Sequence, residues 1–258
     1  MCQRLGWIAS IKTPGVEHSQ TGRYTLGMSL AGRSCFSIML IRAPSTIAYL
    51  GIVNNGYSTS FFAPTILKQF GWTSVHAQVM SIPVYVVACV LALLVAYLSD
   101  RCRHRYAFAM SGLVIASIGY ILLLCQDAIS VRVRYLAIYF IIGGGYITQP
   151  IVLVWLMNNL SGHYKRSIGA AVQIGFGNCG GIVASNIYLT NEAPTYPVGF
   201  GVSLALLWLC GLACTIFYLG LRMENKKREK GGRDYRLDLS REDLENLGDD
   251  HPRFRFVY

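Results

Sequence analysis

Six long runs without any Asp, Glu, Lys or Arg constrain this chain more than any other feature of its sequence. Each run has about 20 to 25 residues, and together they cover approximately residues 43–67, 77–98, 106–126, 135–157, 167–189 and 198–221. A hydrocarbon core about 30 Å thick is crossed by about 20 apolar helical residues. In lipid only helices and closed barrels satisfy all backbone hydrogen bonds, and these runs are too long for barrel strands. The sequence therefore predicts an all-α membrane protein with six transmembrane helices.

The overall composition separates this prediction from a soluble helical protein with a very large core. Hydrophobic residues make up 53% of the chain and charged residues 14%, whereas soluble domains have about 25% charged residues. Helices of soluble proteins also alternate apolar and polar faces. Here the charges are instead gathered between the runs, as expected for segments that lie in a lipid bilayer.

The loops between the runs indicate how the helices are oriented. One side carries Arg101, Arg103, Arg105, Lys165, Arg166, Arg222, Lys226, Lys227, Arg228, Lys230, Arg233 and Arg236. The other side carries Lys68, Arg132 and Arg134. Because basic loops remain in the cytosol, we predict that both termini are cytosolic and that the sequon at Asn159 is not glycosylated. The basic residues behind the net charge of +10 lie in loops and indicate how the protein is oriented in the membrane. We therefore predict no nucleic-acid partner.

Two polar regions flank the predicted membrane domain at 43–221. Residues 1–42 contain spaced bases and no sustained apolar run, and we interpret them as a cytosolic N-terminal stretch or as the product of a truncated gene model. Residues 222–258 are first basic and then acidic, so we expect a mobile cytosolic tail.

The sequence does not indicate an enzyme, a cofactor or a metal site. It has no GxSG nucleophile, no HExxH and no CxxC, and its histidines are scattered. Residues 175–180 read GFGNCG, which matches the GxGxxG pattern of dinucleotide-binding loops. That pattern binds phosphate only between a strand and a helix. Because this copy lies inside an apolar run, we predict that its glycines serve close helix packing.

Two groups of residues resemble a known transporter family. LSDRCRHR at 98–105 is similar to the loop between the eighth and ninth helices of the major facilitator superfamily, with Asp100, Arg101 and Arg105 retained and Ala96 in place of glycine. The run NNLSGHYKRSIGAAVQIGFGNCGGIVASNIY at 158–188 is similar to fungal anion:cation symporters of the allantoate permease type. YSTSFFAPTIL at 57–67, APTYPVGFG at 193–201 and the ending HPRFRFVY extend the resemblance over about 45–258.

The resemblance implies a fold, a function and several partners. The six runs would correspond to helices seven to twelve, the C-terminal half of a twelve-helix carrier in the plasma membrane. Such a carrier moves small organic anions, of the allantoate or nicotinate type, together with protons. The loop with Asp100, Arg101 and Arg105 would latch the cytosolic side in one conformation. Transport would need an N-terminal half or a homodimer. The alternative is a membrane fragment with a regulatory role or with no function.

Polar residues inside the runs are the candidate substrate contacts, because polar groups in lipid face a cavity or another helix. The candidates are Asn54, Tyr57, Trp155, Gln173 and Asn178. Each amide could equally bond a neighbouring helix, and Trp155 could be an interfacial anchor.

The fourth run also contains residues that can bend a helix. Gly144 and Pro150 interrupt it, and they suggest either a gate for alternating access or a static kink.

Overall fold

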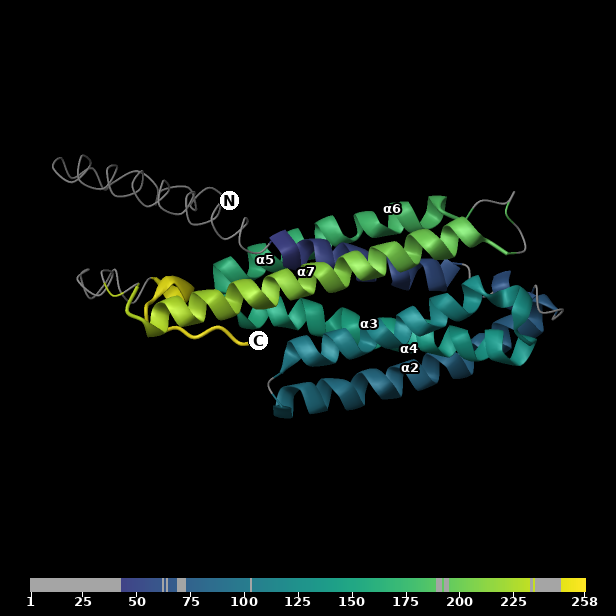
Figure 1. The fold of residues 1–258 in the computed structure, drawn as a ribbon, viewed down its shortest axis with the longest axis horizontal. Helices are drawn as coiled ribbons and strands as arrows, with labels where there is room; N and C mark the ends of the chain where they lie inside the picture. Colours follow the sequence, from purple (N-terminus) through teal and green to yellow (C-terminus); the bar gives the residue numbers. More distant parts are fainter. Residues whose placement is uncertain are drawn as a thin grey trace, which may run out of the picture. The chain divides into compact units, whose positions relative to one another are not determined.

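The computed structural model describes residues 43–258 apart from 62, 64, 69–72, 103, 189–191, 193–194, 233 and 235–246. Every regular element in these residues is a helix (Figure 1). The first is a helical segment at 43–61, which we call the central helix. The order then is α2 (Ser74–Cys102), α3 (Arg105–Leu124), η1 (Gln126–Ala128), α4 (Val131–Asn158), α5 (His163–Gly177), α6 (Cys179–Asn186), α7 (Pro197–Glu229) and η4 (Gly248–Asp250). The expected stretch 1–42 lies outside the described residues.

Several of these helices have the length and composition that a membrane requires. Those long and apolar enough to cross one are Val75–Cys102, Arg105–Leu124, Val131–Asn158, His163–Asn186 and Pro197–Glu229. The predicted all-α membrane class is confirmed, and each of these five helical stretches overlaps one of the last five uncharged runs. The runs 106–126 and 167–189 extend a few residues beyond the ends of their helices, at Leu124 and Asn186. The first run contains the central helix. The last helix continues to Glu229, beyond its predicted end at 221.

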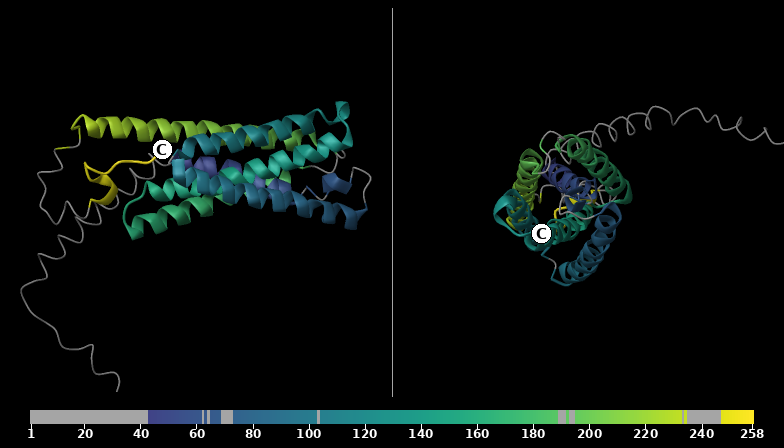
Figure 2. Two further views of the ribbon diagram at one scale, coloured as in Figure 1. Left: turned by 90° about the horizontal axis from the view of Figure 1, so that it is seen from below. Right: turned by 90° about the vertical axis from the view of Figure 1, so that its right-hand side faces the viewer.

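The central helix is enclosed by the rest of the bundle (Figure 2, right, purple). Its residues 51–55 are all buried. On one side Gly51 faces α7, where a Cβ on this glycine would lie 2.5 Å from the backbone oxygen of Leu206. On another side Asn55 donates from Nδ2 to the backbone oxygen of Ile141 in α4, at 3.4 Å. The helix therefore joins α4 to α7.

Helix α2 lies at the edge of the bundle and packs mainly against α4 (Figure 1). Three alanines recur every four residues along α2: Ala88 is fully buried, and Ala92 and Ala96 are half-buried. The opposite side of α2 carries exposed apolar side chains such as Leu93 and Tyr97. Such a face is suited to lipid.

Helices α3 and α4 meet along glycines. A Cβ on Gly144 would lie 2.6 Å from the backbone nitrogen of Ala116 and would also contact the backbone oxygen of Gly112. Helices in lipid associate by such close backbone approach at small residues. Gly144 is therefore a crossing point of two helices, inside an α4 that continues through Pro150 as one helix. Its predicted role in bending stays a prediction.

The C-terminal segment (residues 247–258) is held by two asparagine side chains. Asn225 of α7 brackets Phe256: its Nδ2 donates to the Phe256 oxygen and its Oδ1 accepts from the Phe256 nitrogen, each at 2.9 Å. Asn159 brackets Val257 in the same manner, at 2.9 and 2.8 Å. The extended end of the chain is thereby fastened to α7 and to the end of α4.

Charged side chains fasten the same segment at a second place. Arg228 donates from Nη1 to the backbone oxygens of Asp249 and Phe254, both at 3.0 Å. Lys165, near the start of α5, forms an ion pair with Asp249 at 3.2 Å. The expected mobile tail therefore differs from the structure at its end: residues 247–258 are bound to helix ends, because their backbone groups find buried side-chain partners.

Replacing Gly144 by Ala is expected to lower the free energy of unfolding by about 1–3 kcal/mol, because the added methyl group forces the α3 backbone away. The matched control is Gly220→Ala in α7, since a Cβ there meets nothing within 4 Å. Thermal unfolding of both variants in detergent measures the difference. Equal Tm values for both variants would contradict the close crossing.

Replacing Asn225 by Ala is expected to free the C-terminal segment, because both backbone groups of Phe256 lose their partner at a cost of about 1–3 kcal/mol. Hydrogen exchange of the amides in 247–258 should then accelerate about tenfold or more. Lys226→Ala, at the exposed neighbouring position, is the control and should leave the exchange unchanged. Unchanged exchange in Asn225→Ala would refute the bracket.

Candidate functional site

Polar and aromatic side chains from four helical elements lie near mid-span, and we call this group the mid-span face (Tyr57, Tyr85, Tyr146, Gln149 and Asn178). The Tyr57 hydroxyl donates to Oδ1 of Asn178 at 3.3 Å. The rings of Tyr85 and Tyr146 meet edge-on, with 6.0 Å between centroids. The amide oxygen of Gln149 lies 3.5 Å from a Cβ built on Gly56, beside Tyr57. The face thus joins the central helix with α2, α4 and the junction of α5 and α6.

The mid-span face lies near the middle of the membrane-crossing helices. Tyr146 stands at the middle of α4, and Asn178 separates α5 from α6 within the span His163–Asn186. Asn178 and Tyr146 are exposed in this chain, and Tyr57 is half-buried. Exposed polar groups at this depth face a cavity or another protein surface rather than lipid.

The GFGNCG sequence explains how Asn178 comes to lie beside Tyr57. A Cβ on Gly181 would meet the Tyr57 ring at 2.9 Å, and one on Gly180 would meet the backbone oxygen of Leu50 at 2.6 Å. Helices both precede and follow the motif, so the strand that a dinucleotide site requires is not there. The packing interpretation therefore agrees with the structure at Gly177, where a Cβ would meet the Tyr49 ring, and at Gly180, but not at Gly175, where a Cβ would meet nothing within 4 Å.

Two further candidates, Gln173 and Asn54, lie inside the bundle. Gln173 is fully buried and donates from Nε2 to Oγ of Ser45 at 3.1 Å, so it bonds a neighbouring helix, as its alternative interpretation proposed. Asn54 is also fully buried, next to Gly180, and neither its Nδ2 nor its Oδ1 has a hydrogen-bond partner. An unpaired buried amide is destabilising. Asn54 is therefore a candidate whose side chain forms no hydrogen bond within the described part of the fold.

Trp155 is set apart from the other candidates. Its indole nitrogen donates to the backbone oxygen of Val257 at 3.0 Å, and its ring packs against Phe217 at 4.8 Å between centroids. The side chain therefore belongs to the contacts of the C-terminal segment. A substrate contact by Trp155 stays a prediction. Among the described residues, no hydrogen bond or ring contact joins Trp155 to a side chain of the mid-span face.

A buried polar network around Tyr120 in α3 is not predicted by the sequence. The Tyr120 hydroxyl donates to Oδ1 of Asn55 at 2.6 Å. Nearby, Ser203 of α7 lies within hydrogen-bonding distance of Ser58 and Tyr188, at 3.5 and 3.4 Å. The only sequence signal was the polarity of these residues within apolar runs, which does not tell which helices they join.

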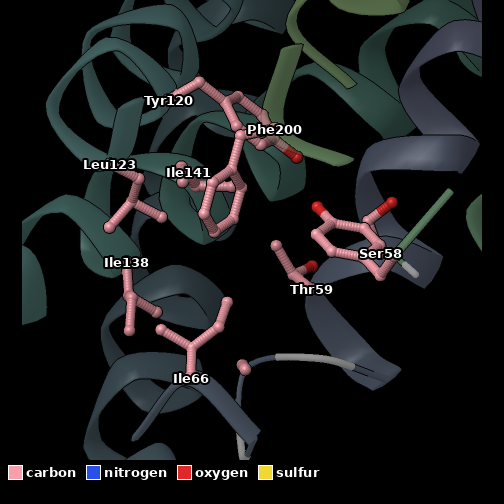
Figure 3. Close-up of a pocket in the computed structure, with 10 residues that line it drawn as sticks. Ser58, Thr59, Ile66, Tyr120, Leu123, Ile138, Ile141 and Phe200 are labelled. Atoms are coloured by element: carbon pink, nitrogen blue, oxygen red, sulfur yellow. The ribbon is translucent and has the colours of Figure 1, made fainter. Parts of the chain in front are cut away.

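A small cavity adjoins this network (Figure 3). Its lining is Ser58, Thr59, Ala63, Ile66, Tyr120, Leu123, Ile138, Ile141, Tyr188 and Phe200. Its volume of about 10 Å³ suffices for one water molecule at most. The cavity is therefore too small to be a substrate site in this conformation, and the exposed mid-span face is the better candidate.

The loop between α2 and α3 forms a charged cluster. Asp100 accepts from Nη2 of Arg105 at 2.6 Å. With its amide oxygen turned toward Arg105, Asn158 accepts from Nε and Nη2 of the same guanidinium, both at 2.9 Å. Arg105 thus ties the ends of α2 and α4 to the start of α3, while Arg101 is exposed. Among the described residues, no group of three or more His, Cys, Asp or Glu could hold a metal ion.

Comparison with known proteins decides the family. The model of the Major Facilitator Superfamily matches residues 45–249. The chain belongs to this superfamily. The uncharacterized transporter C11D3.18C of Schizosaccharomyces pombe is 38% identical over 174 residues, which are 67% of this chain and 34% of that protein. The MFS-type transporter cnsO of Penicillium expansum is 38% identical over 210 residues, 78% of this chain and 40% of that protein.

A third relative carries a substrate in its name. The high-affinity nicotinic acid transporter of Saccharomyces cerevisiae is 27% identical over 215 residues, 83% of this chain and 40% of that protein. The chain thus spans about two fifths of the length of these curated relatives. No solved structure matches this chain. The superfamily that the sequence resembled is confirmed.

The two adjacent asparagines allow a matched test of the unpaired amide. Asn54→Leu is expected to raise the free energy of unfolding by about 1–3 kcal/mol, because an unsatisfied amide leaves the core. Asn55→Leu is expected to lower it by a similar amount, since the Tyr120 hydroxyl and the Ile141 oxygen lose their partner. Thermal unfolding of both variants gives the comparison, and equal losses would show that Asn54 is paired after all.

Proposed function

We propose that residues 43–229 form one six-helix half of a proton-coupled carrier for small organic anions, of the allantoate or nicotinate type. The observation that carries this proposal is the mid-span face, where Asn178 and Tyr146 are exposed and Tyr57, Tyr85 and Gln149 are half-buried near the middle of the apolar helices. Substrate sites of secondary transporters lie at this depth, between two repeats of the fold. The nicotinic acid transporter among the relatives supports a carboxylate as the substrate.

The chemistry of the face suits a carboxylate. Because Oδ1 of Asn178 accepts from Tyr57, the amide is oriented with its Nδ2 available to donate to a ligand. Neutral donors bind an anion without placing an unpaired cation in the membrane, which would be costly. The rings of Tyr85 and Tyr146 offer flat apolar surfaces beside these donors.

We propose that the titratable group for proton coupling lies outside this half, on the partner surface that covers the mid-span face. None of the six uncharged runs contains Asp, Glu, Lys or Arg, and a coupling site needs a titratable group inside the membrane. We therefore place that group in a second six-helix half, or in a second copy of the chain, that covers the mid-span face.

The remaining assignments follow the superfamily. We propose that both termini are cytosolic, in the plasma membrane. The cluster of Asp100, Arg101 and Arg105 then acts as a latch on the cytosolic side, and α4 bends near Gly144 and Pro150 during the cycle. The contacts of Arg105 with Asp100 and Asn158 support this, because they join three helix ends at one guanidinium.

Uptake of radiolabelled nicotinate tests the proposal. The carrier is a chimera in which residues 43–258 replace the second half of the yeast nicotinic acid transporter, reconstituted in proteoliposomes with a proton gradient. Saturable, gradient-driven uptake is expected. Asn178→Ala is expected to lower kcat/KM about tenfold or more, because a hydrogen bond to a charged ligand contributes about 1.5–3 kcal/mol. Tyr57→Phe should lower it less, since it removes only the group that orients Asn178.

The matched control is Tyr97→Phe, an exposed tyrosine on the outer side of α2, which should transport normally. The chain alone should show no saturable uptake; if it did, the assignment of a half would be wrong. A chimera that reaches the membrane and moves no small carboxylate would overturn the proposed function.

A further inference from the structure

Helix α7 is longer than the membrane that it crosses. It has 33 residues, which corresponds to about 50 Å at 1.5 Å per residue. The hydrocarbon core is about 30 Å thick and the headgroup layers bring the bilayer to about 40–45 Å. The last turns of α7, from Arg222 onward, therefore extend through the headgroup layer and beyond it.

These last turns have two different faces. Leu221, Asn225 and Arg228 recur at intervals of four and three, so they share one face of the helix, and all three are buried. Arg222, Lys226 and Lys230 recur every four residues on the opposite face, and all three are exposed. Lys227 is exposed beside them. We call Arg222, Lys226, Lys227 and Lys230 the basic strip.

The C-terminal segment covers one face of the last turns of α7 and leaves the other face exposed. Asn225 and Arg228 are used by Phe256, Asp249 and Phe254, through the hydrogen bonds described above. The guanidinium of Arg228 also lies over the Phe256 ring, 4.5 Å from its centroid. The protein therefore covers one side of the helix end and leaves the basic strip outward.

The basic strip continues an apolar stripe that faces lipid. Leu212, Ile216, Leu219 and Met223 recur at intervals of four, three and four, and each is about half or more exposed. Lys226 follows at the next interval of three, and Lys230 at the next interval of four. Because one helix face passes from apolar to basic without a break, the basic strip stands directly above the lipid that contacts Leu219 and Met223.

We propose that the basic strip binds the headgroups of anionic phospholipids in the adjacent leaflet. Ammonium and guanidinium groups form charge-assisted hydrogen bonds with phosphate and carboxylate oxygens. Basic residues next to a membrane helix are attracted to anionic lipids. Glu229 is the one acidic side chain exposed within this part of the helix, so the charge remains strongly positive. The lipid would fix the depth of α7, independently of any transported substrate.

Spin-labelled lipids measure this preference on the purified full-length chain in vesicles. The measurement is the association constant of labelled phosphatidylserine relative to labelled phosphatidylcholine. The wild-type chain is expected to prefer phosphatidylserine. Lys226→Gln together with Lys227→Gln should lower the ratio by about fivefold for each base removed. Lys226→Arg with Lys227→Arg should keep it, because the charge is kept.

The matched control is Lys68→Gln together with Arg132→Gln, two exposed bases that lie outside α7. It should leave the ratio unchanged, and an equal loss there would overturn the proposal. So would a wild-type ratio of one, or displacement of phosphatidylserine by millimolar inorganic phosphate. The assay contains no transport substrate, so its outcome is separate from that of the uptake test.

Discussion

Close contact between helix backbones at glycine is the interaction on which the rest of this bundle depends. In lipid the apolar surface of a helix gains little by leaving its solvent, so helices associate through van der Waals packing at short distance. Three such contacts organise the molecule: Gly144 of α4 on α3, Gly51 of the central helix on α7, and Gly180 of α6 on the central helix. A methyl group at any of them would meet backbone rather than a movable side chain. The arrangement of the helices around the central helix is therefore determined mainly at glycines, which have no side chain to keep the backbones apart.

The same contacts create the candidate site. Because Gly181 lets the Tyr57 ring approach α6 closely, the Tyr57 hydroxyl reaches Asn178, which is 121 residues away in the chain. Gly180 brings the neighbouring turn so near that Asn54 is enclosed with its amide unpaired. Helix packing and the candidate site thus both use the stretch 175–181, and the resemblance of its GFGNCG part to a nucleotide loop is a consequence of the small residues that both need.

Much of this could be predicted from the sequence, and the limits have physical causes. Uncharged runs of spanning length predict the helices, because the bilayer imposes a single length scale. The choice of Tyr57 and Asn178 also follows from polarity within a run. The sequence could not show that Trp155 binds the backbone of Val257, or that Asn55 rather than Asn54 is the paired amide. A side chain's polarity reports that it needs a partner. Which partner it finds depends on how each helix is rotated about its axis and on the path of irregular backbone. Neither of these leaves a periodic pattern in the sequence.

The distribution of charge divides the molecule by depth. At the ends of the helices ionic contacts occur, with Arg105 on Asp100 and Lys165 on Asp249, beside neutral ones such as that of Asn159 with Val257. At mid-span they are neutral, through amides and hydroxyls such as Asn178 and Tyr57. Water and headgroups stabilise a charge at the ends, whereas a charge at mid-span is stable only next to an opposite charge or within a hydrated cavity. A neutral mid-span face avoids that cost, and in the proposed carrier any charge used in transport would have to be supplied by the surface that covers it.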